Sequence, residues 1–153
     1  MWYRIFLLTS MAILAGCGRQ AQDPRPMAGS WFAEVEAVVD HGHSGFAVVS
    51  LSPDETTRAN LTMSGGSGGG VHPWHVHEGT CASGGPIVGN PTEYPLMRPD
   101  SSGDASATVA LDEPLSTDED ARYHVAMHQS ANDETVVGCG DLVSNRPRGV
   151  AAR

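Results

Sequence analysis

The pair of histidines at positions 75 and 77 is the feature of this sequence best suited to metal chemistry. Val76 separates His75 from His77, and Cys81 follows four residues after the second histidine. In an extended strand every second side chain points to the same face, so the two imidazoles project together about 7 Å apart while Val76 faces a core. Neutral imidazoles placed in this way can bind one late transition-metal ion, such as copper or zinc.

A second pair of histidines contains the candidate third ligand. Alternation in residues 123–128 predicts a strand with one apolar, core-facing side and with His124 and His128 on the other side. These two histidines are four residues apart, or about 13 Å along a strand, so only one of them can share an ion with His75 and His77. The alternative is that all of these are ordinary surface histidines.

The three cysteines indicate an exported protein. Residues 1–17 combine a basic start at Arg4 with a short apolar stretch and end in Leu-Ala-Gly-Cys, which resembles the lipobox of bacterial lipoproteins. This resemblance implies that Cys17 carries a lipid, and an ordinary secretory signal is the alternative. Cys81 and Cys139 are then left as a pair that an oxidising compartment would join, although two free thiols binding a metal remain the competing interpretation.

Composition divides the remaining chain into three parts. Residues 18–29 have no periodic apolar pattern and predict a flexible tether, residues 30–145 predict one folded domain, and residues 146–153 predict a disordered tail. We therefore expect a lipid-anchored protein of the bacterial cell envelope, on the periplasmic face or at the cell surface. The formal charge of -9 argues against nucleic acid as a partner.

Short runs of alternating apolar residues predict an all-β domain, either an antiparallel sandwich or a flattened barrel. The runs cover residues 31–39, 45–51, 58–63, 72–77, 105–111, 123–128 and 136–143. Between Cys81 and Asp104, four prolines and several glycines predict a long irregular loop over one edge of the sheet. His41 and His43 are interpreted as part of a solvated turn, and a reach to the metal is the less favoured alternative.

Two segments resemble the metal-binding strands of copper-zinc superoxide dismutases. The run Trp-His-Val-His-Glu at residues 74–78 is similar to the family's Phe-His-Val-His-Glu copper strand. His128 opens the run His-Gln-Ser-Ala-Asn-Asp, which is similar to the family's His-Glu-Lys-Ala-Asp-Asp. Cys81, and Cys139 between two glycines, match the family's disulfide, and the glycine-rich residues 64–70 resemble the turn before its copper strand.

This resemblance covers most of residues 31–143 and implies an antiparallel Greek-key barrel or sandwich of about eight strands. It implies one copper ion held by His75, His77 and His128. It also implies a disulfide between the two cysteines named above. His72 points away from the ligand face and is a candidate to orient a ligand through a hydrogen bond.

The departures from the family pattern concern zinc and the guidance of anions. Ile87 stands after Gly-Pro, where the family has a histidine that bridges copper and zinc, and no histidine lies between His77 and His124 to replace the other zinc ligands. Zinc is therefore not expected. Asn132 replaces an aspartate that links the two metal sites, and Val136 replaces the arginine that guides superoxide.

The resemblance implies a superoxide dismutase-like, copper-binding envelope lipoprotein, with superoxide or a copper ion as its small partner. Because the bridging histidine and the guiding arginine are missing, we expect superoxide to be dismutated to oxygen and hydrogen peroxide with low efficiency. No catalytic residue is assigned; His72 and Glu78 are the nearest proton donors in the sequence. The alternative is a non-enzymatic lipoprotein that binds copper or keeps the fold only as a scaffold.

Overall fold

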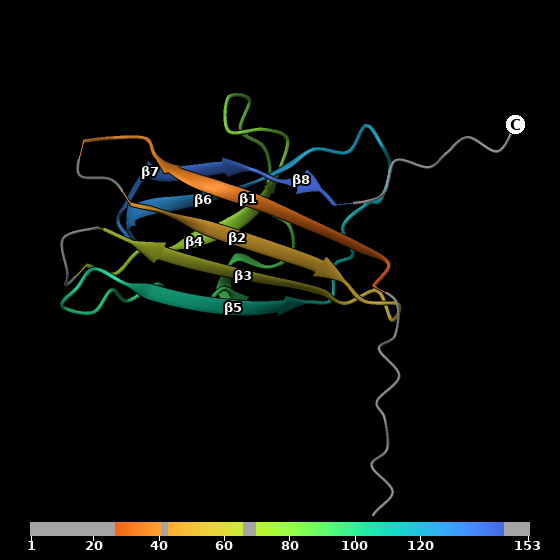
Figure 1. Cartoon of the computed structure of the whole chain (residues 1–153), viewed down its shortest axis with the longest axis horizontal. Helices are drawn as coiled ribbons and strands as arrows, with labels where there is room; N and C mark the ends of the chain where they lie inside the picture. Colours follow the sequence, from red (N-terminus) through yellow and green to blue (C-terminus); the bar gives the residue numbers. More distant parts are fainter. Residues whose placement is uncertain (1–26, 41–42, 66–69, 146–153) are drawn as a thin grey trace, which may run out of the picture.

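The computed structural model describes residues 27–40, 43–65 and 70–145 (Figure 1). The predicted leader, most of the tether, His41 and the predicted tail lie outside these residues. In chain order the elements are β1 (Gly29–Ala37), β2 (Ser44–Leu51), β3 (Thr57–Ser64), β4 (Trp74–Glu78), the short 3-10 helix η1 (Pro91–Glu93), β5 (Ala105–Leu111), β6 (Tyr123–Ser130), β7 (Asp133–Asp141) and β8 (Val143–Ser144).

The strands form one strongly curled antiparallel sheet in the order β4-β6-β7-β1-β2-β3-β5, and β8 pairs with β1. The first three strands form a meander. The chain then crosses to the opposite edge of the sheet, where it forms β4, and crosses back to form β5, which pairs with β3. This all-β half-barrel confirms the predicted fold class and is consistent with a Greek-key barrel or sandwich. In the part of the chain that the structure describes, no helix is long and apolar enough to cross a membrane.

The core lies inside the curl and receives every second residue of the strands. On β1 the residues Trp31, Ala33 and Val35 are buried, and the residues between them are partly or fully exposed. On β4 the buried residues are Trp74 and Val76, so the histidines of that strand point outward. The period-2 pattern therefore placed both β4 histidines on the correct face.

The long loop after β4 covers the outer edge of that strand, as its prolines and glycines predicted. Its backbone pairs with β4 through hydrogen bonds from Glu78 N to Pro86 O and from Val88 N to Val76 O, both 2.9 Å. Further along, Tyr94 and Met97 are buried in the core. The loop thus fills the space between the two edge strands and lies against the outward-facing histidines.

Candidate metal centre

Three imidazoles from two adjacent strands converge on the outward face of the sheet. His75 and His77 belong to β4 and His128 to β6, and one ring nitrogen of each lies within 4.8 Å of the others. Three nitrogens bound to one ion at 2.0–2.1 Å in trigonal or tetrahedral geometry are about 3.4–3.6 Å apart, so binding requires the ring nitrogens to close by at most about 1.4 Å. The structure therefore brings together the three residues that the sequence suggested.

In two of these rings, a hydrogen bond to the backbone determines which ring nitrogen is left to bind a metal. Nδ1 of His77 lies 3.0 Å from the carbonyl oxygen of Gly85, and Nδ1 of His128 lies 2.9 Å from that of Glu134. A carbonyl oxygen only accepts, so each Nδ1 carries the hydrogen and each Nε2 carries a free lone pair. A metal-binding histidine characteristically donates its other ring N–H in this way.

Two of the three rings have a buried nitrogen without a hydrogen-bond partner, as do the neighbouring rings of His43 and His124. Nε2 of His77 is one such atom, and Nδ1 of His75 is another. An unpartnered buried polar atom costs free energy, commonly about 1–3 kcal/mol, and such an atom in a native structure calls for an explanation. An ion bound between these lone pairs would supply the missing partner.

Burial keeps the rings of His75 and His77 neutral, which is the form that binds a metal. It lowers the pKa of His75 to about 4, with further lowering by His128 and His77, while a hydrogen bond with the Pro91 backbone opposes the shift. Burial also lowers the pKa of His77, against the opposing effect of the bond to Gly85. At neutral pH both rings are therefore available as ligands.

A cleft of about 230 Å³ gives access to the three rings. We call it the histidine cleft; its lining residues are Pro73, His75, His77, Ile87, His128, Ser130, Ala131 and Glu134. Ile87 forms an isolated β-bridge with His77, so an apolar side chain covers one side of the ligands. None of the lining residues is a lysine or an arginine, and Glu134 contributes the one carboxylate. The electrostatics of the cleft therefore do not favour a small anion.

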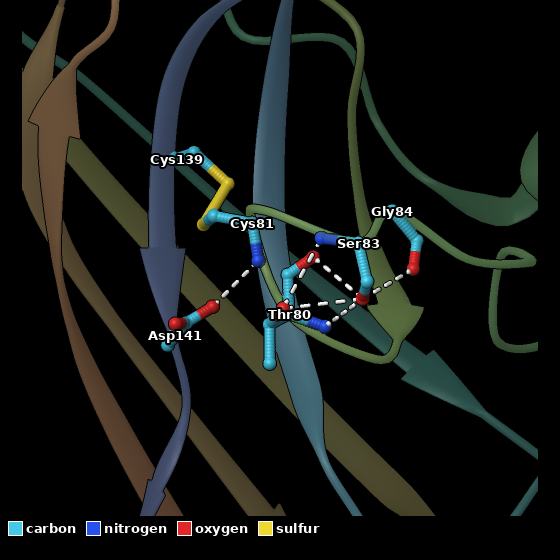
Figure 2. Close-up of a disulfide and its surroundings, with 6 residues drawn as sticks. All are labelled: Thr80, Cys81, Ser83, Gly84, Cys139 and Asp141. Atoms are coloured by element: carbon cyan, nitrogen blue, oxygen red, sulfur yellow. Dashed lines mark hydrogen bonds between the residues drawn. A yellow bond between two sulfur atoms is a disulfide. The ribbon is translucent and has the colours of Figure 1, made fainter.

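A disulfide holds the loop that orients His77. Cys81 and Cys139 are bonded, with their Cα atoms 6.0 Å apart, which ties the segment after β4 to β7 (Figure 2). The Cys81 N–H also donates to the Asp141 carboxylate at 2.6 Å. Figure 2 shows the Ser83 hydroxyl within hydrogen-bond distance of the backbone of this turn: it accepts from the Thr80 N–H and can donate to the carbonyl oxygen of Thr80 or Gly84. The predicted cysteine pair is thus present in the structure.

His72 does not contact a ligand ring; it contacts the backbone of one ligand. Its Nδ1 lies 3.1 Å from the carbonyl oxygen of His128, and the His72 backbone bonds with that of Met97 in both directions. His72 therefore helps to position the strand that carries His128.

His43 corrects one interpretation of the sequence. Predicted to lie in a solvated turn, it is buried, and its ring packs against that of His72 with centroids 4.5 Å apart. It is not part of the ligand group. The neighbouring glycine and serine suggested a turn, but the packing of the ring against His72 buries it.

His124 is a neighbour of the site that sequence reasoning set aside. Its ring is buried and stacks on that of His77, with centroids 5.0 Å apart and planes 20° apart. The register pairs the two residues directly across β4 and β6, which accounts for the stack. As the distance along the strand predicted, His124 and His128 do not both belong to the ligand group.

The other residues that the sequence did not reveal act through their backbones or through packing. The carbonyls of Gly85 and Glu134 orient two ligands, and carbonyl positions leave no side-chain signature in a sequence. Tyr94 contacts the His75 ring edge-on at 5.0 Å between centroids. The only available signal for Tyr94 was a lone aromatic residue in a loop rich in proline.

Val136 and Asn132 both lie close to the strand that carries His128. Val136 on β7 pairs with His128 on β6. Asn132 is exposed in the turn between these two strands. Neither side chain can supply a positive charge or bind zinc.

A scan against protein-family models gives no match for this chain, and a search of the curated proteins gives no significant match.

Proposed function

We propose that this chain is a superoxide dismutase-like, copper-binding lipoprotein of the bacterial cell envelope. The observation that supports the proposal most strongly is the convergence of His75, His77 and His128, the first two of which have a buried ring nitrogen without a partner. Three neutral imidazoles suit copper well, in particular as a three-coordinate Cu(I) site. The choice of copper over zinc rests on the motif resemblance, since the ligands retained are those of the copper half of the family site.

Bound copper would supply one-electron chemistry by alternating between its two oxidation states. Three imidazoles of the chain would hold the ion, and backbone carbonyls would accept the Nδ1–H groups of His77 and His128. Ile87 would exclude water from its side of the cleft. We expect low dismutase efficiency. Electrostatic guidance raises association rates by about 10- to 1000-fold, and the cleft offers a carboxylate instead of a cation.

A second candidate function is copper binding or transfer without catalysis. It is favoured by the surroundings of the ligands, because Ile87 in the histidine cleft and Val136, which pairs with His128, provide neither a proton nor a positive charge. Both candidates predict copper in the site, and they differ in whether superoxide is consumed. The exported, lipid-anchored location belongs to this proposal and is supported by the lipobox-like sequence at Cys17 and by the disulfide.

Metal analysis of the purified chain by mass spectrometry tests the proposal. We expect one copper per chain in the parent, and loss of that copper when both His75 and His77 are changed to alanine. His124→Phe is the matched control, because it removes an imidazole stacked on His77 but outside the ligand group, and it should retain the copper. Retention of copper by the double variant contradicts the site.

Superoxide removal by the copper-loaded parent then separates the two candidates. Slow removal that depends on His75 and His77 supports the enzyme, whereas copper without any removal selects the binding protein. Removal near the diffusion limit would contradict the inference drawn from the anionic cleft.

A further inference from the structure

The outward face of β8, β1 and β2 carries a patch of large apolar side chains. Phe32, Phe46, Val48 and Val143 are 52%, 61%, 53% and 56% exposed, and we call them the apolar patch. Phe32 lies directly opposite Val48 on one side and Val143 on the other, so three of the four form a row across adjacent strands. Phe46 lies two residues before Val48 on the same face of β2.

The polar residues beside the apolar patch have their hydrogen bonds satisfied within the sheet. The row continues through Asn60 on β3 to Thr108 on β5, and the Asn60 amide donates to the Thr108 hydroxyl at 2.9 Å. The hydroxyl of Thr62 donates to the carbonyl of Phe46 at 3.2 Å. The row from Val143 to Thr108 contains no charged residue, although the chain as a whole has a formal charge of -9. This row is therefore uncharged and has little left to hydrate, while Glu34 and Arg58 lie to either side of it on the same outer face.

The size of the apolar patch and the charge of the chain argue against a second copy as its partner. Two half-exposed phenylalanines and two half-exposed valines present roughly 400 Å² of apolar surface, about half of the ~800 Å² that each partner buries in a typical stable complex. Two copies with a formal charge of -9 each would also repel one another.

The length of chain before β1 argues for a lipid surface. Cys17 and Gly29 are twelve residues apart in the sequence, so the chain between them spans at most about 40 Å even when fully extended. A lipid on Cys17 would hold β1, the strand that carries Phe32, close to the bilayer. Apolar and aromatic side chains on a surface held in this way can insert at the boundary between headgroups and acyl chains.

We propose that the apolar patch rests on the surface of a bilayer with uncharged headgroups, and that this contact sets the orientation of the domain. The proposal rests on the lipid anchor of the proposed function. Anionic lipids are the poorer partner, because the chain is acidic and Glu34 lies on the same face beside Phe46.

The consequence for the metal centre follows from the two faces of the sheet. The apolar patch lies on the outer face of β1 and β2, and the inner face of these strands packs on the core. The histidine cleft lies on the outer face of β4 and β6, whose inward-facing residues Val76 and Val125 pack on the same core. Figure 1 looks onto the outward face of β1, β2 and β3, with β4 behind them. Contact through the apolar patch would therefore point the histidine cleft away from the membrane and into the aqueous compartment.

Tryptophan fluorescence in phosphatidylcholine vesicles with brominated acyl chains tests this orientation. The full chain is reconstituted with either Phe46→Trp or Ala131→Trp. Position 131 is the matched control because it is exposed beside the histidine cleft on the opposite outer face. After subtraction of the parent's fluorescence, we expect the tryptophan at 46 to be quenched at least about two-fold more strongly than that at 131. Equal quenching, or no quenching at 46 in vesicle-bound protein, overturns the proposal.

Mass spectrometry of the acyl group on Cys17 separates failure of the anchor from failure of the apolar patch. If the chain is unlipidated and the tryptophan at 46 is still quenched, the docking surface is supported and the lipid anchor of the proposed function is refuted. A lipidated chain without quenching at 46 retains the anchor and refutes the docking surface, and an unlipidated chain without quenching refutes both. Concentration-dependent dimers that protect position 46 from the bromines would assign the apolar patch to a second copy and overturn the proposal.

Discussion

Removal of the disulfide tests how the fold supports the metal centre. The bond joins residues 58 positions apart, and in the chain-entropy model a loop of this length corresponds to about 4 kcal/mol of stability at 25 °C. We expect Cys81→Ser with Cys139→Ser to lower the free energy of unfolding by about that amount, which corresponds to a shift of roughly 2 M in the urea midpoint. The measurement is urea unfolding of the metal-free chain, followed by circular dichroism.

The same variant should also weaken copper binding. The disulfide anchors the segment that contains Gly85, whose carbonyl holds Nδ1 of His77. Loss of an orienting partner of a ligand typically costs 10- to 100-fold in metal affinity, so we expect an increase in the copper dissociation constant of roughly 10-fold or more. Competition with a chromophoric chelator under conditions where the variant stays folded measures this change.

Ser101→Ala, in the exposed turn before β5, provides a control that should leave both quantities unchanged. Unfolding of the double cysteine variant at the parent's urea concentration would show that the disulfide does not stabilise the fold. Copper binding by the folded variant with the parent's affinity would show that His77 does not depend on the tethered loop.

Three further predictions concern the groups around the site. Burial lowers the pKa of His75 from 6.5 to about 4, so the metal-free folded state binds fewer protons than the unfolded state, and the free energy of unfolding should fall as the pH drops from about 6.5 towards 4. Because the ring is partly exposed, we expect a loss of about 1–2 kcal/mol, and urea unfolding of His75→Asn with a chelator present should show a correspondingly flatter pH profile. Tyr94→Phe removes a buried hydroxyl that donates to the Val88 carbonyl at 2.8 Å and should cost about 1–2 kcal/mol in thermal unfolding; an unchanged midpoint would mean that the bond is dispensable. Gly140→Ala places a Cβ against the Glu34 carbonyl where β7 approaches β1, and we expect it to destabilise the fold by about 2–4 kcal/mol in thermal unfolding. A variant as stable as the parent would show that the two strands can move apart without cost.

Much of the fold could be predicted because the strands alternate cleanly. Residues 31–39 and 45–51 were expected as strands and are observed as β1 and β2 with small shifts at the ends, because each has one continuous apolar face. The last hairpin was harder to predict. The segment after His128 continues β6 to Ser130 and turns at once into β7 at Asp133, a polar stretch with no alternation to reveal it.

The site was only partly predictable for a related reason. Spacing on one strand placed His75 and His77 side by side, but the choice of His128 over His124 depended on the motif resemblance. The structure explains the difference: His124 pairs directly with His77 and stacks on it, whereas His128 lies close to His75 through the curl of the sheet. Curl and cross-strand register are properties of the whole sheet, which no single strand pattern reports.

A crystal structure of the copper-loaded chain, with anomalous scattering recorded at the copper edge, tests the central claim most directly. We predict one copper ion about 2.0–2.1 Å from Nδ1 of His75, Nε2 of His77 and Nε2 of His128, with the carbonyls of Gly85 and Glu134 still accepting the outer N–H groups. Copper bound elsewhere on the chain, or bound to His77 or His128 through Nδ1, would contradict the account.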